Sequence, residues 1–443
     1  MLRFALGLLA LGLVSHPLRA ADKPNVIVIV GDDMGYADVG AHGCKDIPTP
    51  NLDALAKAGT RFTSGYVSGP YCSPTRAGLL TGRYQTRFGH EFNGAGPNVG
   101  LPVTETTIAD RMKAAGYATG WVGKWHLGAA DKFHPQKRGF DEAFGFLGGA
   151  HAYFPDQGKS DTVLRGTKDA NETEYLTDAF GREAVTFVDQ NKAKPFFLYL
   201  AFNAVHTPMH ATDARLKRFE GIKDVQRRTY AAMMVAMDEA VGKLVTKLRD
   251  EKLEQNTLVF FFSDNGGPTM KGTTINGSVN TPLRGSKRTT LEGGVRVPFF
   301  VTWPARLPAG RVSDVPVIQL DVLPTVLAAA GVAAKPDWKL DGVDLLPHLT
   351  GHAKTAPHDA LYWRFGAQMA VRKGDWKLVK YDAAVDNGTG TTAARLYNLA
   401  DDIGETTDLA AKRPEKVQEL QAAWDKWNEG NVAPLWGSGK QKD

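Results

Sequence analysis

The chain of 443 residues has few cysteines, little net charge and no hydrophobic run long enough to span a membrane. Its two cysteines, Cys44 and Cys72, allow one disulfide at most, which excludes the disulfide-dense class of small secreted domains. A formal net charge of +5 without a long basic run argues against a nucleic-acid-binding protein. The apolar run over residues 4–14 is shorter than the roughly 20 residues that a membrane-spanning helix needs.

The first twenty residues have the pattern of a secretory signal. A basic start at Arg3 precedes the apolar run, and the segment ends in the small residue Ala20. We therefore predict an exported protein, periplasmic or secreted, with no membrane span. The predicted domains are the signal peptide 1–20, a large domain 21–347 and a C-terminal subdomain 348–443, since about 420 remaining residues suit one large domain with a smaller one.

Short apolar runs alternate with helical patterns along most of the chain. Such an alternation predicts an α/β fold with a large, mostly parallel or mixed sheet between helices. The apolar runs read as buried parallel strands, and they are Asn25–Val30, Tyr117–Val122, Pro195–Phe202, Thr257–Phe262 and Pro298–Trp303. Thr49 is predicted to cap a helix that Pro50 opens, and a long helix is predicted over about residues 230–253.

The last hundred residues follow a different pattern. Four short, aromatic-rich segments, "ALYWRF", "QMAVRK", "WKLVKY" and "ARLYNL", read as antiparallel strands, and a terminal helix follows from Pro414 to about Glu429. We predict a small α+β subdomain that contains an antiparallel sheet.

Chemically active side chains follow the predicted parallel strands. In such sheets, ligands bind beyond the carboxyl ends of the strands. The residues at these ends are Asp32 and Asp33, Lys124 and His126, His206, and Asp264 with Asn265. The three carboxylates and the amide oxygen predict a site for a hard cation, either Ca²⁺ or Mg²⁺; the competing interpretation is that these acids are solvated turn residues. Lys124, His126, His206 and Lys287 would add donors for an anionic substrate group with protons to move.

The segment "CSPTRAGLLTG" places Cys72 at a predicted helix start. Pro74 suits the first helical turn and Gly82 the end of the helix. Free backbone N–H groups there bind anions and lower the pKa of a thiol, and Arg76 lies one turn further along. The pattern favours a reactive side chain aimed at an oxyanion, although a disulfide with Cys44 or an inert buried thiol stays open.

The chain resembles the type I sulfatases of the alkaline phosphatase superfamily. The segment "CSPTRAGLLTGR" is similar to their C-x-P-x-R signature, and further similar blocks follow in family order along nearly the whole mature chain. These blocks are "NVIVIVGDDMGYADVG", "TPNLDALAKAGTRFTSGY", "GYATGWVGKWHLG", "FNAVHTP", "FFSDNGG" and "LRGSKRTTLEGGVRVP". The resemblance implies an alkaline phosphatase-like fold and a sulfuric ester hydrolase.

The resemblance also implies the cofactors and the site residues. A maturation enzyme would convert Cys72 to Cα-formylglycine, whose hydrate attacks a sulfate ester and later releases sulfate by elimination. One Ca²⁺ would be held by Asp32, Asp33, Asp264, Asn265 and the modified Cys72. The implied roles of the others are orientation of the hydrate by Arg76, sulfate binding by Lys124 and Lys287, proton removal by His126, and protonation of the departing alcohol by His206 with Lys287.

The substrate is less well defined by the sequence. The general pattern resembles bacterial polysaccharide sulfatases acting on galactose or N-acetylgalactosamine sulfates, so a sulfated carbohydrate is expected. Candidate sugar-binding residues are Arg87, His90, Glu91, Asn93, His151, Tyr153, Arg284 and Arg288. Two alternatives stay open: a phosphodiesterase or phosphonate hydrolase of the same superfamily, and an inactive relative that binds sulfated glycans. Cys44 is expected to be a free structural thiol.

Overall fold

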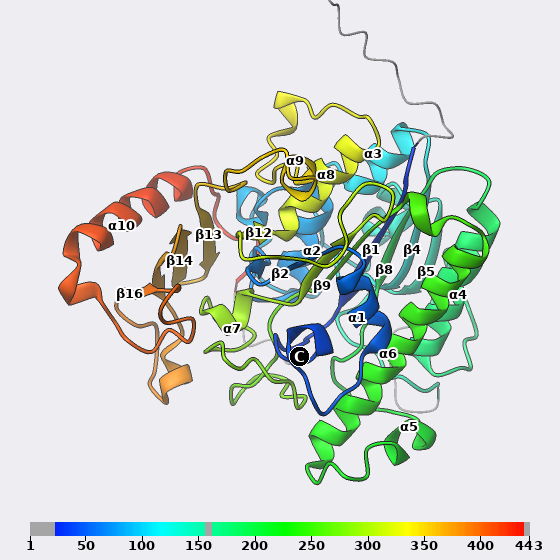
Figure 1. Ribbon diagram of the computed structural model, residues 1–443, viewed down its shortest axis with the longest axis horizontal. Coiled ribbons are helices and arrows are strands. Elements are labelled where there is room, and N and C mark those ends of the chain that lie inside the picture. Colours follow the sequence, from blue (N-terminus) through cyan, green and yellow to red (C-terminus); the bar gives the residue numbers. More distant parts are fainter. Residues whose placement is uncertain (1–22, 156–161, 438–443) are drawn as a thin grey trace, which may run out of the picture.

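The computed structural model describes residues 23–155 and 162–437. Among these residues a mixed sheet of ten strands forms the centre of the molecule, in the order β11-β2-β10-β9-β1-β8-β4-β5-β6-β7 (Figure 1). The five strands β9, β1, β8, β4 and β5 are parallel to one another. The predicted signal peptide, residues 1–20, lies outside the described residues.

The strands are short, and their bounds follow. They are β1 Asn25–Gly31, β2 Thr60–Phe62, β3 Gly65–Tyr66, β4 Ala118–Lys124, β5 Glu142–Phe146, β6 Leu164–Arg165, β7 Lys168–Asp169, β8 Phe196–Ala201, β9 Thr257–Ser263, β10 Phe299–Thr302, β11 Arg311–Ser313, β12 Val317–Ile318, β13 Leu361–Phe365, β14 Gln368–Lys373, β15 Trp376–Lys380 and β16 Arg395–Asn398. The helices are α1 Pro50–Lys57, α2 Cys72–Thr81, α3 Ile108–Ala114, α4 Leu176–Asn191, α5 Asp213–Lys217, α6 Val225–Asp250, α7 Glu292–Val295, α8 Val322–Ala329, α9 Leu346–Leu349 and α10 Pro414–Asn428.

Helices cover both faces of the large sheet, which explains why its central strands are apolar throughout. In β1, Ile27 and Ile29 belong to the core beneath α1, α4 and α6, whereas Val26, Val28 and Val30 belong to the core beneath α2, α3 and α8. Successive side chains of a strand point to opposite faces, so a strand buried on both faces needs apolar residues at every position. Figure 1 shows α4 and α6 on one side of the sheet and α2 and α8 on the other.

The C-terminal residues form the predicted subdomain. Strands β13, β14, β15 and β16 pair in sequence order as an antiparallel sheet, and α10 packs on it through Leu420. The side of α10 that meets the sheet also carries Trp424 and Trp427, whose rings contact each other, and the Trp427 ring stacks on Tyr362. The fold class is thus confirmed in both of its parts.

Two local predictions are wrong. Strand β10, predicted to be parallel, is antiparallel to β9, with Phe299 opposite Phe262. The reason is that no long helix separates the two strands: the chain leaves β9, builds a loop at the carboxyl edge of the sheet and re-enters from that edge, whereas a parallel return needs a crossover. In addition, Thr49 precedes α1 but gives it no side-chain cap, because its hydroxyl contacts Asp53 and the Gly40 N–H.

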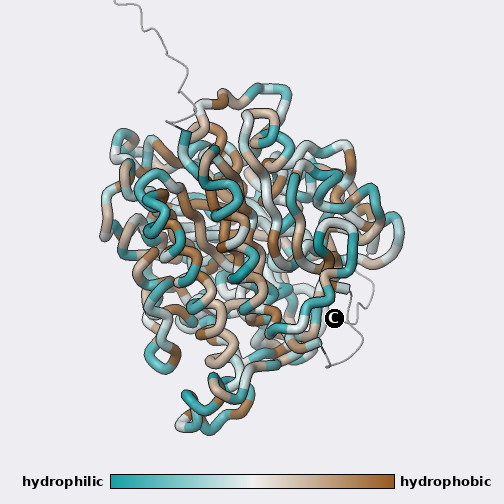
Figure 2. The backbone as a smooth tube through the Cα atoms, turned by 90° about the vertical axis from the view of Figure 1, so that its right-hand side faces the viewer, coloured by the Kyte–Doolittle hydropathy of each residue, from teal (hydrophilic) through white to brown (hydrophobic). Residues whose placement is uncertain are grey.

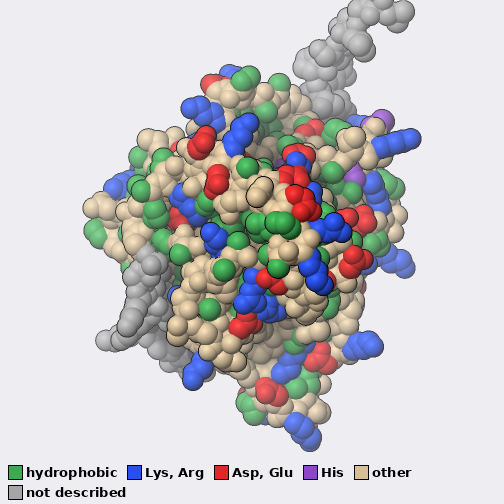
Figure 3. Space-filling model, turned by 90° about the vertical axis from the view of Figure 1, so that its left-hand side faces the viewer, with side chains coloured by type: hydrophobic (Ala, Val, Ile, Leu, Met, Phe, Trp, Pro, Cys, Tyr) green, Lys and Arg blue, Asp and Glu red, His purple; other side chains and the backbone are tan. Residues whose placement is uncertain are grey.

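The surface is polar and mixed in charge. Figure 2 shows hydrophobic segments through the interior and hydrophilic ones mainly at the periphery. On the face that carries the C-terminal subdomain, basic and acidic side chains are interspersed (Figure 3). Within the described residues, no helix combines the length and the apolar character that crossing a bilayer requires.

Candidate active site

The polar residues predicted at the strand ends do meet at one edge of the sheet. Strands β1 and β9 are adjacent and in register, with Gly31 opposite Ser263, so Asp32 and Asp33 lie beside Asp264 and Asn265. All four side chains are fully buried. Ligand atoms of Asp32, Asp33, Asp264 and Cys72 lie within 4.8 Å of one another, which is close enough to hold a single cation.

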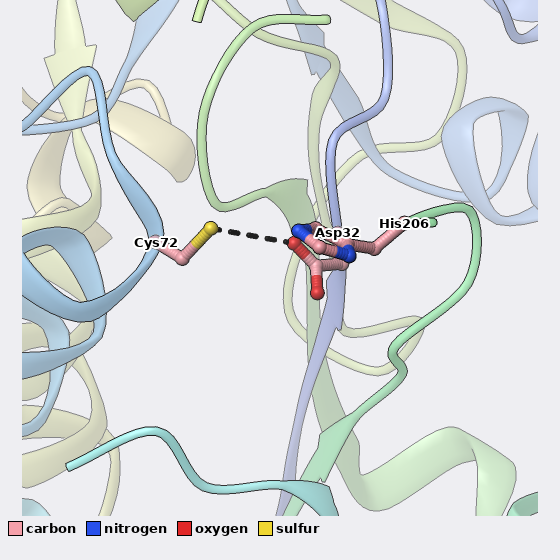
Figure 4. A group of neighbouring side chains, drawn as sticks. All are labelled: Asp32, Cys72 and His206. Carbon is pink, nitrogen blue, oxygen red and sulfur yellow. Dashed lines mark hydrogen bonds between the residues drawn. The ribbon is translucent and has the colours of Figure 1, made fainter. Parts of the chain in front are cut away.

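Helix α2 brings Cys72 to this edge. Cys72 is the first residue of the helix, Pro74 lies in the first turn, and Gly82 ends the helix with a φ of 65°, the left-handed conformation that favours glycine. The Cys72 Sγ lies 3.6 Å from Asp32 Oδ1, and Figure 4 shows the thiol pointing at Asp32 and His206 from the opposite side of the site.

Two expectations for Cys72 are resolved by this environment. Both cysteines are free thiols, so no disulfide joins Cys72 to Cys44. The prediction of a lowered thiol pKa is wrong: burial raises the pKa of Cys72 well above its usual value, and the opposing effects of Lys124 and Lys287 are smaller. At neutral pH the unmodified side chain is a neutral thiol and a poor nucleophile.

Each of the three carboxylates lies nearest to a different basic side chain. Lys124 Nζ lies 2.6 Å from Asp32 Oδ2, and Lys287 Nζ lies 2.9 Å from Asp33 Oδ2. Arg76 Nη2 lies 2.8 Å from Asp264 Oδ2, and a second donor, Nε, lies 3.0 Å from the same oxygen. Three negative and three positive side chains therefore balance, and an added divalent cation would give the site the positive charge that an anionic group requires.

Three observations on the donor atoms fit a hard cation. Asn265 donates through Nδ2 to Asp33 Oδ1 at 2.6 Å, but its buried Oδ1 has no hydrogen-bond partner and is available as a ligand. Burial and the carboxylate of Asp32 raise the pKa of Asp264 to about 6. Burial also opposes ionisation of Asp33, yet Lys287 and His206 lower its pKa to about 2. A bound cation would relieve the repulsion among the carboxylates.

The two histidines of the site have distinct hydrogen bonds. His206 Nδ1 lies 2.6 Å from the Thr207 carbonyl, so Nδ1 carries a proton and Nε2 faces Lys287 Nζ at 3.4 Å. Burial first, and then Lys287, lower the pKa of His206 to about 4. Burial and Lys124 also lower the pKa of His126 well below its usual value. Both rings are therefore neutral at neutral pH, and the His126 Nδ1 has no hydrogen-bond partner.

The loop after β9 contributes two residues that the sequence did not indicate. Thr274 Oγ1 lies 3.4 Å from both Asp33 Oδ2 and Lys287 Nζ, at the rim of the site. Asn276, fully buried, donates from Nδ2 to the carbonyls of Asp33 and Val205 and so ties the loop of Asp33 to the loop of His206. The segment "TTINGSVN" does not directly follow a strand and contains no charged side chain and no histidine, so the sequence gave no reason to select it.

Several of the candidate sugar-binding side chains already have partners within the chain. Glu91 is bound by Arg364 and the Gly366 N–H, and Arg87 is bound by Asp341 and the Trp427 carbonyl. Arg284 contacts Asp386 and Tyr381, both from the C-terminal subdomain. A sugar would have to displace these contacts in order to reach the three side chains.

The other candidates divide into buried and half-exposed residues. His90, Asn93 and Tyr153 are buried, and the Tyr153 hydroxyl donates to the carbonyls of Asn203 and His206. Arg288 and His151 are half-exposed. The Arg288 guanidinium lies over the ring of Tyr71, the residue before Cys72, so Arg288 stays at the mouth of the site.

With this geometry in place, the chain was compared with known proteins. The sulfatase family matches residues 24–332, and the family described as N-sulphoglucosamine sulphohydrolase, C-terminal, matches residues 285–427. The chain belongs to the sulfatase family. This sulfatase is a sulfuric ester hydrolase, as its curated relatives are. It is 38% identical to N-acetylgalactosamine-6-sulfatase of Canis lupus familiaris over 386 residues, which cover 81% of this chain and 72% of that protein. It is also 33% identical to arylsulfatase G of Rattus norvegicus, with 90% and 85% covered.

Solved structures of similar proteins agree with this assignment. The sulfatase superposes on the crystal structure of Ps i-CgsB with a TM-score of 0.87 and 41% identity, and 94% of each chain is covered. The same protein has been solved in complex with k-i-k-neocarrahexaose. The PsFucS1 sulfatase from Pseudoalteromonas sp. is similar at 25% identity and a TM-score of 0.80, with 93% of this chain and 91% of that chain covered.

Proposed function

We propose that this sulfatase removes sulfate from a sulfated polysaccharide of the galactose or N-acetylgalactosamine type. The observation that carries the proposal is the buried cluster in which Cys72 faces three carboxylate–cation pairs. The class of sugar is supported by the relatives named N-acetylgalactosamine-6-sulfatase and by the oligosaccharide complex of Ps i-CgsB.

The site residues have roles that follow from their positions. Asp32, Asp33, Asp264 and Asn265 would hold Ca²⁺ through oxygen atoms, with the side chain at position 72 as a further ligand. Lys124 and Lys287, which lie 2.6 Å from Asp32 Oδ2 and 2.9 Å from Asp33 Oδ2, would bind the sulfate oxygens. Arg76 would hold Asp264 and orient the side chain at position 72. When bound, Ca²⁺ would supply a Lewis acid, and a formylglycine formed from Cys72 by a maturation enzyme would supply the nucleophilic hydroxyl.

Proton transfer is assigned to the two histidines. His126 is neutral, and its unpartnered nitrogen makes it a base for the proton lost during sulfate release. In the tautomer assigned from the contact of Nδ1 with the Thr207 carbonyl, His206 has no proton on Nε2, and that atom faces the Lys287 ammonium. The proton for the departing alcohol would therefore come from the His206–Lys287 pair rather than from His206 alone.

Half-exposed side chains at the mouth of the site would contact the sugar. Arg288, Thr274 and His151 are the candidates that the structure favours, because they lie beside Tyr71, Lys287 and Phe146 without being fully buried. Arg87, Glu91 and Arg284 are less suitable because their polar atoms already have partners, and His90 is less suitable because it is fully buried.

Two measurements test the proposal. Peptide mass across residues 71–76 should show formylglycine in place of cysteine when the protein is produced with a maturation system. Sulfate release should be detectable on sulfated galactose or N-acetylgalactosamine oligosaccharides and absent in Cys72→Ala. Full activity of a preparation that contains only the thiol would overturn the mechanism, and release only from other sulfated sugars would overturn the substrate class.

The phosphodiesterase alternative is tested in the same assay. Among the described residues, the groups that could hold a metal all include Asp32, so the acidic cluster is one site rather than two separate ones. Faster cleavage of phosphate diesters than of any sulfate ester would favour the alternative. We also propose that residues 1–20 direct export, which N-terminal sequencing of the protein recovered outside the cytoplasm would test.

A further inference from the structure

Beside the site, a buried chain of hydrogen bonds joins His90, Ser73 and His126. Ser73 directly follows Cys72 in α2, and its Oγ lies 2.7 Å from the carbonyl oxygen of His126 and 2.6 Å from His90 Nε2. The Ser73 N–H donates to Asn93 Oδ1 at 3.1 Å. His90 and Ser73 are 0% and 3% exposed.

The chemistry of these groups fixes the direction of the bonds. A carbonyl oxygen can only accept a hydrogen bond, so the Ser73 hydroxyl donates its single proton to the carbonyl oxygen of His126. The contact between Ser73 Oγ and His90 Nε2 then requires His90 to be the donor. Burial lowers the pKa of His90 to about 3, so the ring is neutral. The two contacts of Ser73 assign its single proton to Nε2.

The hydrogen-bond chain ends at His126, whose backbone has an unfavourable conformation. His126 has a φ of 56°, a left-handed conformation that a residue with a side chain adopts only when its surroundings impose it. Its N–H donates to the Leu147 carbonyl at 3.1 Å, and Ser73 binds its carbonyl from the other side. The residue next to Cys72 therefore sets where the His126 ring stands relative to Cys72.

We propose that His90 is a positioning residue, which acts through Ser73 to hold His126 against the start of α2. The inference rests on the proposed function, in which His126 removes a proton. It replaces the sequence-based expectation that His90 binds the sugar. A small displacement of a proton acceptor lowers the rate of the reaction while leaving substrate binding intact.

His90→Leu and His90→Gln form the decisive pair of variants. The Gln side chain can place an amide N–H near the position of Nε2, whereas Leu cannot donate at all. His90→Leu should lose about 10²-fold in kcat with KM unchanged, and His90→Gln should recover most of that loss. Crystal structures should show the His126 ring displaced in the Leu variant and in place in the Gln variant.

Matched controls separate this role from simple destabilisation. His348 is 6% exposed and lies 3.3 Å from Ser313 Oγ, so His348→Leu removes another buried histidine from a serine outside the site. It should lower Tm as His90→Leu does but keep kcat. Peptide mass must show equal conversion of Cys72 in all variants.

Three results would overturn the inference: equal kcat in His90→Gln and His90→Leu, a rise in KM alone, or an unmoved His126 ring in the Leu variant. A wild-type protein that releases no sulfate would instead contradict the proposed function, and the crystal structures would then still test the position of His126.

Discussion

At the scale of single residues, Asp264 links the cation ligands to Arg76. Its Oδ2 accepts two bonds from the guanidinium, and its Oδ1 lies 3.3 Å from the Asp33 N–H. Asp264→Asn keeps the shape of the side chain but removes the negative charge that attracts a hard cation. We expect Ca²⁺ to raise the Tm of the wild type, since a ligand at 100 times its Kd stabilises by about 2.7 kcal/mol, and to raise the Tm of the variant much less.

A buried carboxylate elsewhere provides the control for this experiment. Asp238 is 1% exposed and accepts the N–H groups of Asn51 and Leu52 at the start of α1. Asp238→Asn should lower Tm with and without Ca²⁺ by the same amount, because the residue is no ligand. Scanning calorimetry with added Ca²⁺ or a chelator makes the comparison. An unchanged Ca²⁺ effect in Asp264→Asn would remove Asp264 from the ligand set.

At the scale of elements, β14 of the small sheet holds the segment that carries Lys287. The side chain of Gln368 accepts the Thr290 N–H at 3.2 Å and donates to the Arg288 carbonyl at 2.9 Å, while the Arg288 N–H donates to the Pro70 carbonyl close to Cys72. Gln368→Leu removes both bonds of the amide. We expect kcat to fall by about 10²-fold through misplacement of Lys287, measured by sulfate release.

The surface of the same subdomain offers a control for that variant. Gln421 on α10 donates to Asp425 in an exposed i, i+4 pair, so Gln421→Leu should leave kcat unchanged. Equal activity of the two variants would show that the hydrogen bonds of Gln368 are not needed to position Lys287.

His358, which precedes β13, makes a pH-dependent contact with Asp321, the residue before α8. His358 Nε2 lies 2.8 Å from Asp321 Oδ1, and although burial disfavours the charged ring, the carboxylate raises the pKa of His358. A histidine whose folded pKa exceeds the unfolded value of about 6.5 stabilises most below that pH, and the gain disappears as pH rises through the folded pKa. The Tm advantage of the wild type over His358→Gln should therefore shrink from acidic to alkaline pH, and a constant difference would contradict it.

Much of the site could be predicted because its residues follow a rule of position. Asp32, Lys124 and Asp264 end strands that are parallel, and the carboxyl ends of such strands share an edge. Asn276 and Gln368 obey no such rule, since each acts on a backbone carbonyl or N–H that is distant in sequence. The orientation of β10 likewise depends on the path of a loop, which an apolar run does not encode.

The thiol pKa of Cys72 shows a different limit of sequence reasoning. The helix start was visible in the sequence and favours the thiolate, but the complete burial of the side chain was not visible, and burial raises the pKa of the thiol. Similarly, the sequence placed Glu91 and Arg87 near the site but could not show that Arg364 and Asp341 already bind them.

At the scale of the whole molecule, a buried ionic cluster joins the catalytic region to the C-terminal sheet. Lys377 Nζ on β15 lies 2.8 Å from Glu292 of α7 and 3.0 Å from Glu405, and all three side chains are fully buried. Glu405 also accepts the Glu292 N–H at 2.7 Å. The two family matches overlap over residues 285–332, which include Glu292, so the two regions share a segment. We infer that they unfold together.

Lys377→Met tests this coupling because it removes the ammonium and leaves the carboxylates buried. Breaking a buried ion pair by removing one partner costs about 3–5 kcal/mol, which the midpoint and slope of denaturant unfolding would report. Lys380→Met, at the half-buried end of the same strand, should cost far less.

Burial already raises the pKa of Glu405 to about 7, with Lys377 opposing the shift. Without Lys377 the pKa of Glu405 in the folded protein rises further. A carboxyl group whose pKa is higher in the folded state than in the unfolded state binds more protons in the folded state. The free energy of unfolding of the variant therefore falls as pH rises. The variant should therefore be closest to the wild type under acidic conditions, and a deficit that does not grow with pH would show that Lys377 does not balance Glu405.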